Sequence, residues 1–278
     1  LLNATDGPDI DSAKVLLTLI ETRPEEALAP QITRARNHQN PVSLAHFAAL
    51  DPTQERIRQE LACFGIFYHY RSEIEQPPDN LNLRISEALQ ALALLEPDPR
   101  FPVWLKASSA LMSDPSGQYY QGIFHAGVRG VHLANAVYCF RQILALARAA
   151  DRGSTGVDRL VYRHGSYMLA SVLLKRLRAR IQSPQPINPG DIPHLISQPF
   201  DELRQQALDL FTRTITGVGP LSCFKSQERS VPYLCDLALA NYRLESHEAV
   251  LAIRSQQDDG PFPQARMFRF LSRKAPQI

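Results

Sequence analysis

The sequence has little cysteine and little glycine, and it contains no cysteine pair of the C-x-x-C type. Its 278 residues include 4 cysteines and 13 glycines. The cysteines stand far apart, at positions 63, 139, 223 and 235. This spacing excludes a disulfide framework and a zinc ribbon, and it favours buried thiols in a reducing compartment. We therefore expect a cytoplasmic protein.

Long hydrophobic runs are missing as well. The longest apolar stretch, residues 167–174, ends at Lys175. It is much shorter than the roughly 20 residues that a helix needs to cross a bilayer, so no transmembrane span is expected. The first residues include Asp6 and Asp9 and lack a basic segment followed by an apolar run, so they do not fit the pattern of a secretion signal.

Strand signals are almost absent, whereas 21 prolines and regular apolar spacing indicate helices that are separated by short turns. Apolar residues recur at intervals of three and four, and proline or aspartate precedes many of these runs. We predict an all-α fold, an irregular bundle of about ten helices with short proline-punctuated loops. The expected helices cover residues 9–20, 24 onward, 40–50, 51–76, 81–95, 101–112, 122–150, 158–182, 201–214, 232–257 and 263–274.

Proline spacing also suggests how the chain is divided. Prolines at positions 184, 186, 189, 193 and 199 leave no room for regular structure between residues 183 and 200. We predict a main helical domain at 1–182, a proline-rich connector at 183–200 and a C-terminal helical subdomain at 201–278 that packs on the first. The connector is either a flexible linker or a strap that packs on the core.

Motifs of the known catalytic classes are missing: there is no P-loop, G-x-S-x-G, G-x-G-x-x-G or H-E-x-x-H. One polar stripe is nevertheless a candidate for chemistry, because His125, Arg129 and His132 share a face of the helix predicted at 122–150. The two histidines could line a catalytic or ligand pocket. They lie about 10.5 Å apart along a straight helix, which is too far for one shared metal. The competing interpretation is that they are hydrogen-bonded structural histidines.

Two further candidates are local. Cys223 lies close to Lys225, and a neighbouring cation lowers the pKa of a thiol and makes it reactive. His69 and Glu73 are four residues apart, so both side chains would project from one helix face toward a metal. Two ligands do not make a metal centre, and a helical di-metal site needs a second pair. We therefore expect a surface ion pair at this position and no metal or cofactor.

Charge is distributed unevenly although the formal net charge is only +2. Residues 1–30 hold two basic and six acidic side chains, whereas residues 151–182 hold seven basic and two acidic ones. The last predicted helix adds a second cationic face, and such faces are typical of contacts with partners. The candidate partner-binding residues are Arg159, Arg163, Lys175, Arg176, Arg178, Arg180, Arg266, Arg269, Arg273 and Lys274.

Three classes of function remain. The preferred one is a non-enzymatic interaction module, an adaptor, scaffold or regulatory protein that docks another protein or an acidic peptide segment on the basic surface. A nucleic-acid-binding protein is the first alternative, although the chain is close to neutral and has no known reading motif. An enzyme with a histidine-lined helical pocket is the second, and it lacks an evident nucleophile, base or metal in defined mutual geometry.

Overall fold

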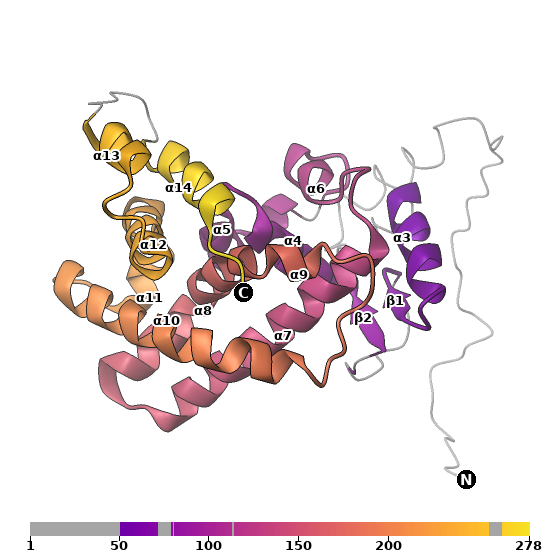
Figure 1. Cartoon of the computed structure of the whole chain (residues 1–278), viewed down its shortest axis with the longest axis horizontal. Coiled ribbons are helices and arrows are strands. Elements are labelled where there is room, and N and C mark those ends of the chain that lie inside the picture. The colour runs from indigo at the N-terminus through magenta and orange to yellow at the C-terminus, as the bar shows by residue number, and fades with distance from the viewer. Residues whose placement is uncertain (1–50, 72–78, 80, 113, 256–262) are drawn as a thin grey trace, which may run out of the picture. The chain divides into compact units, whose positions relative to one another are not determined.

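The computed structural model describes residues 51–71, 79, 81–112, 114–255 and 263–278 (Figure 1). Residue contacts divide the chain into two compact units, Leu1–Val42 and Ser43–Ile278, and every described residue belongs to the second. The helices predicted at 9–20, from 24 and at 40–50 therefore lie outside the described residues, as does Glu73. No helix in the described ranges is long and apolar enough to cross a membrane.

The fold of this unit is all-α, as predicted. Its two short strands, β1 (Phe67–His69) and β2 (Asn82–Arg84), pair in parallel with Phe67 opposite Asn82. The helices are α3 (Pro52–Ala62), α4 (Ile85–Leu95), α5 (Phe101–Ala107), α6 (Gln118–Ile123), α7 (Gly130–Gly153), α8 (Gly156–Arg176), α9 (Arg178–Ile181), α10 (Ile192–Thr214), α11 (Pro220–Cys223), α12 (Gln227–Tyr242), α13 (Glu248–Ser255) and α14 (Pro263–Lys274), with the 3-10 turn η2 (Ser109–Met112) after α5.

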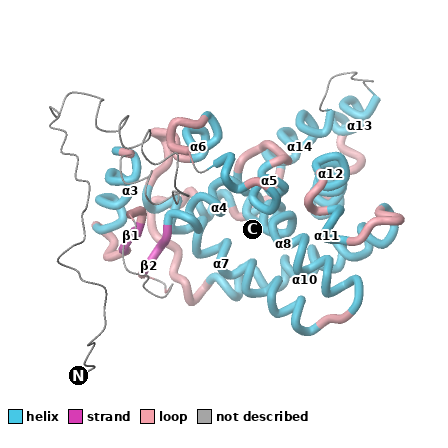
Figure 2. Tube along the Cα trace, turned by 180° about the vertical axis from the view of Figure 1, so that it is seen from behind, coloured by secondary structure: helices cyan, strands magenta, loops and turns pink. Residues whose placement is uncertain are grey.

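The core is built around α7 and α8, which form the most extensive contact between two elements of the unit. Helices α4 and α10 pack against both of them, and α12 packs against α8 and α10. Figure 2 shows α3 and the two strands at one end of the unit and α12, α13 and α14 at the other. Gly165 in α8 permits one close approach, because a Cβ there would lie 3.1 Å from the ring of buried Phe224.

The prediction of one helix over 51–76 is wrong beyond Ala62. Asp51 caps the first turn by accepting a hydrogen bond from Thr53 N at 2.8 Å, as its sequence position suggests. The chain then turns at Gly65, which adopts a φ of +70° that is open to glycine at little cost. The strand β1 follows, so Tyr68 contributes to the core from a strand rather than from a helix face.

Two other predicted helices are divided. The helix expected at 122–150 is not continuous. Residues 122 and 123 are the end of the short helix α6, and the separate helix α7 begins at Gly130. A Cβ at Gly130 would come within 3.1 Å of Ile57 O in α3, so a glycine allows α7 to start against α3. The helix expected at 158–182 is interrupted at Leu177, which separates α8 from the four-residue α9.

The prediction that residues 183–200 lack regular structure is wrong from Ile192 onward. Pro193 lies in the first turn of α10, where a missing backbone N–H costs nothing, and Pro199 lies inside the helix. The preceding segment packs on α7, because buried Asn135 donates to Gln185 O at 3.1 Å and accepts from Ile187 N at 2.7 Å. This contact agrees with a packed strap, and the division into domains stays a prediction.

The C-terminal helices show one more break and one confirmed element. The helix expected at 232–257 is interrupted after Tyr242 by Arg243, whose φ of 56° is left-handed. The helix predicted at 263–274 has the bounds of α14. Trp104 in α5 is 6% exposed and contacts the rings of Phe101 and Tyr119.

Candidate interaction surface around helix α9

Lys175 is not part of a surface, which corrects its predicted role in partner binding. Its side chain is completely buried, and Nζ donates to Leu94 O at 2.6 Å and to Ser171 Oγ at 2.9 Å. The same amine lies 4.8 Å from the centre of the Phe268 ring in α14. Burial lowers the pKa of Lys175 from 10.5 to about 7, because the charged form loses its hydration. Lys175 therefore holds α4, α8 and α14 together.

Arg159 and Arg163, two further residues of the predicted basic surface, form ion pairs within the protein. Each pairs with a different carboxylate oxygen of Asp151 at 3.1 Å, at the junction of α7 and α8. These two cations hold the pKa of Asp151 below its ordinary value, although partial burial opposes that shift. The charge at this end of α8 is therefore largely compensated within the protein.

Arg176, Arg178 and Arg180 gather at the other end of α8, where the chain continues into α9. Within the described residues none of them forms an ion pair. Arg176 donates only to neutral acceptors, Asn241 Oδ1 at 3.1 Å and Pro276 O at 3.4 Å. Arg178 is half-buried and Arg180 is exposed. The charge at this end of α8 is therefore not cancelled by neighbouring carboxylates in direct contact.

Helix α9 separates two cavities, and each receives one of its arginines. Arg178 lines a cavity of about 210 Å³ together with Glu96, His125 and His132. Arg180 lines a larger cavity of about 900 Å³, which lies against the strap and the start of α10 and also contains His194. The short helix thus forms a ridge, which we call the α9 ridge (residues 178–183), with a basic side chain on either side.

The basic residues of α14 lie on its outer face. Phe268 and Leu271 are fully buried beneath it, whereas Arg269, Arg273 and Lys274 are exposed. Arg266 is exposed as well, and it has an interaction partner. The chain after α14 returns to the end of α8 and to the α9 ridge, where Ile278 N donates to Arg176 O at 3.1 Å and Gln277 Oε1 accepts from Ala179 N at 2.8 Å. Two of the predicted cationic segments therefore meet at this end of α8.

His125 and His132 line the same cavity, but not as one face of a helix. His125 lies in the turn before α7, where its Nδ1 accepts from Gly127 N at 3.1 Å, and Arg129 is the N-cap residue of α7. His132 lies in the first turn of α7, and Cys139 is completely buried. Burial and the charge of Arg129 lower the pKa of His132, so its neutral form is favoured. The predicted stripe is wrong; both histidines line one cavity, and a catalytic or ligand-binding role for them stays a prediction.

Glu96 also lines this cavity, and no sequence signal marks it as a site residue. It is the C-cap residue of α4, in a Glu-Pro-Asp-Pro turn that signals only the end of a helix. Burial raises the pKa of Glu96, and this effect outweighs the opposing charges of Lys175 and His125. A carboxylate placed beside histidines by tertiary packing leaves no local pattern in the sequence.

The predicted reactive thiol of Cys223 is not supported. Its side chain is buried at the end of α11, and burial raises its pKa, which favours the inert thiol. Burial likewise raises the pKa of Cys139, to about 12. The four cysteines are all free, and Cys63 is exposed.

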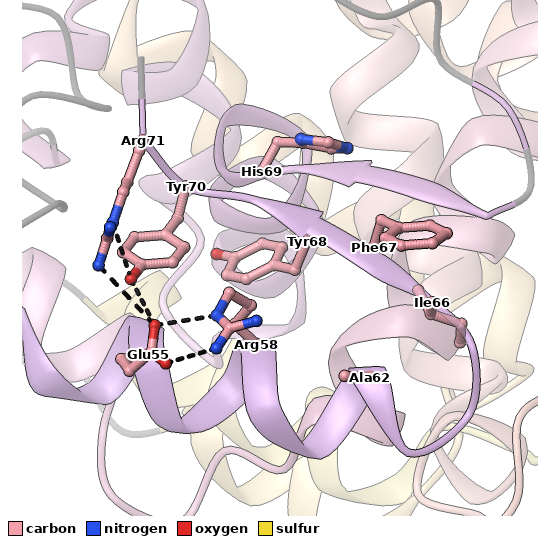
Figure 3. Close-up of a pocket in the computed structure, with 9 residues that line it drawn as sticks. All are labelled: Glu55, Arg58, Ala62, Ile66, Phe67, Tyr68, His69, Tyr70 and Arg71. Atoms are coloured by element: carbon pink, nitrogen blue, oxygen red, sulfur yellow. Dashed lines mark hydrogen bonds and ion pairs between the residues drawn. The ribbon is translucent and has the colours of Figure 1, made fainter. Parts of the chain in front are cut away.

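His69 lies at a further cavity of about 550 Å³, formed between α3 and β1 (Figure 3). Its Nε2 is 2.8 Å from Asn82 Oδ1, and its ring lies on the opposite side of β1 from Tyr70. The other side of the strand faces Glu55, whose carboxylate accepts from Tyr70 and from Arg58. Among the described residues no group of three potential metal ligands occurs. The prediction that His69 and Glu73 project from one helix face is wrong, because His69 lies in strand β1.

The fold is all-α, and Arg178 and Arg180 of the short helix α9 line two different cavities. In comparisons with known proteins, a family model described as AIPR protein matches residues 2–87, which is less than half of the chain. The matched stretch includes α3, both strands and the start of α4, and it does not include α9. No curated protein and no solved structure shows significant similarity to the chain.

Proposed function

We propose that the protein is a helical interaction module, an adaptor or scaffold, that docks an acidic segment of a partner protein across the α9 ridge. The observation that carries this proposal is the placement of Arg178 and Arg180 at cavities on the two sides of one short helix. A partner segment lying across the ridge would contact both guanidinium groups. The four free thiols support a reducing compartment such as the cytoplasm for this role.

Charge supports an acidic rather than a basic partner. Arg176, Arg178 and Arg180 bring three cations to the end of α8, and Arg273 and Lys274 add two from the exposed face of α14. Arginine forms paired hydrogen bonds with carboxylates, so acidic side chains are the chemistry that this ridge fits best. Because the cations are partly exposed, their attraction for an acidic segment would speed the association of the two proteins. Added salt would screen this attraction and weaken binding.

The test is fluorescence anisotropy with a labelled oligoglutamate peptide, using the full chain. The Arg178→Gln/Arg180→Gln double variant should bind this probe about tenfold more weakly than the unchanged protein, since each lost contact is worth up to about 1 kcal/mol. The matched control is Arg159→Gln/Arg163→Gln, which removes two arginines already paired with Asp151. We expect this control to change binding less than about twofold.

A single-stranded DNA oligonucleotide of similar charge serves as the second probe. Tighter binding of the DNA than of the peptide, with a steep salt dependence, would favour the nucleic-acid alternative. Equal losses in the two double variants would contradict a site at the α9 ridge. Circular dichroism of each variant ensures that the comparison is made between folded proteins.

A further inference from the structure

The smaller cavity beside α9 has the features of a site for a small molecule. Its volume of about 210 Å³ is below the range of roughly 300–1,000 Å³ that is usual for sites of drug-sized ligands. It corresponds to the space of about seven waters at roughly 30 Å³ each. Part of its wall is aliphatic, from Leu92, Leu95, Ile123, Val128 and Ile181, and about as much of it is polar, from side chains that include His125, His132 and Gln182. A compact ligand with an aliphatic part fits these dimensions.

Two opposite charges, on Glu96 and Arg178, line this cavity without pairing. Within the described residues, the carboxylate of Glu96 has no hydrogen-bond donor and no ion-pair partner, and the guanidinium of Arg178 has no acceptor. They come from different elements, the end of α4 and α9, and both line the cavity. Neither group is fully buried, and one molecule that carries both a positive and a negative charge would pair with the two of them at once.

We infer that this cavity binds a small zwitterion of the α-amino-acid class, with its ammonium group at Glu96, its carboxylate at Arg178 and an aliphatic side chain against the leucine and isoleucine wall. One such molecule satisfies both charges and places its apolar part where the cavity is apolar. This site goes beyond the docking function, because it takes a free small molecule; it shares Arg178 with the α9 ridge and adds Glu96, which lines only the cavity on the side of α9 away from Arg180.

The test is isothermal titration calorimetry of the full chain with L-leucine. We expect leucine to bind, and we expect N-acetyl-leucine, which lacks the ammonium, and isopentylamine, which lacks the carboxylate, to bind at least about tenfold more weakly. The variants Glu96→Gln and Arg178→Met should each weaken leucine binding by a similar factor. The matched control Glu228→Gln changes an exposed glutamate on α12 and should leave leucine binding unchanged.

Three results would overturn the inference: no leucine binding by the unchanged protein, equal binding of leucine and both analogues, or unchanged binding by Glu96→Gln. Arg180→Met separates this site from the docking surface, because it should weaken the oligoglutamate peptide and leave leucine binding unaffected. Loss of leucine binding without loss of peptide binding in Glu96→Gln would likewise assign the two ligands to different sites.

Discussion

Replacing Lys175 with methionine should change how the stability of the protein depends on pH. In the folded protein the pKa of this amine is lowered from 10.5 to about 7, so it loses its proton near neutral pH. The unfolded chain keeps that proton up to about pH 10.5. Between these values the unfolded state binds more protons, so the free energy of unfolding rises with pH.

The size of the effect follows from the pKa shift. A shift from 10.5 to about 7 corresponds to about 5 kcal/mol, which opposes folding in full below about pH 7. The rise is about 1.4 kcal/mol per pH unit within the window. Methionine removes this cost, and it leaves Leu94 O with a donor, because Ser171 Oγ also bonds it at 3.1 Å. The variant should therefore be the more stable protein below neutral pH.

The assay is urea denaturation of the unchanged protein and Lys175→Met at several pH values between about 7 and 9.5. The difference in unfolding free energy should change by about 3 kcal/mol across this range, in favour of the unchanged protein as pH rises. Cysteines and tyrosines that also titrate are common to both proteins and cancel in the difference. Lys274→Met, on the exposed face of α14, is the matched control. A difference that stays constant with pH would refute the reasoning.

Three further predictions concern packing and backbone geometry. Gly165→Ala should destabilise the protein by about 1–3 kcal/mol in urea denaturation, because the new Cβ would lie 3.1 Å from the Phe224 ring. Asn135→Leu should lower the free energy of unfolding by about 2–4 kcal/mol, because the side-chain amide holds residues 183–191 by hydrogen bonds. The same variant should be cleaved faster by proteases within residues 183–191, and unchanged cleavage would argue against this role of Asn135. Arg243→Gly should raise the unfolding free energy by about 1 kcal/mol, because a φ of 56° is strained for arginine, and a lower value would contradict this account.

The sequence predicts the helices of this protein better than their interruptions. Proline and a buried apolar face define α14 completely, because both signals are local. The end of α3 is set by a glycine turn and by pairing of β1 with a strand more than ten residues away, which no local spacing records. Pro199 predicts irregular structure, yet it is tolerated inside α10, whose Ile196 and Phe200 are buried in the core.

The candidate site shows the same limit. The excess of arginine in residues 151–182 correctly draws attention to α9, because net charge is a property of composition. Tertiary contacts decide which cations remain without a partner. Asp151 forms an ion pair with Arg159, and the buried Lys175 donates a hydrogen bond to Leu94 O. The role of Glu96 was invisible for the same reason, since its neighbours in the cavity come from α7 and α9.

Amide hydrogen exchange with and without the oligoglutamate peptide tests the docking account most directly. We expect slower exchange in residues 178–187, on the α9 ridge and the strap beside it, with exchange at the paired arginines of residues 159–163 unchanged. Slowing confined to residues 151–163, or no slowing near α9 at saturating peptide, would contradict a docking surface at the α9 ridge.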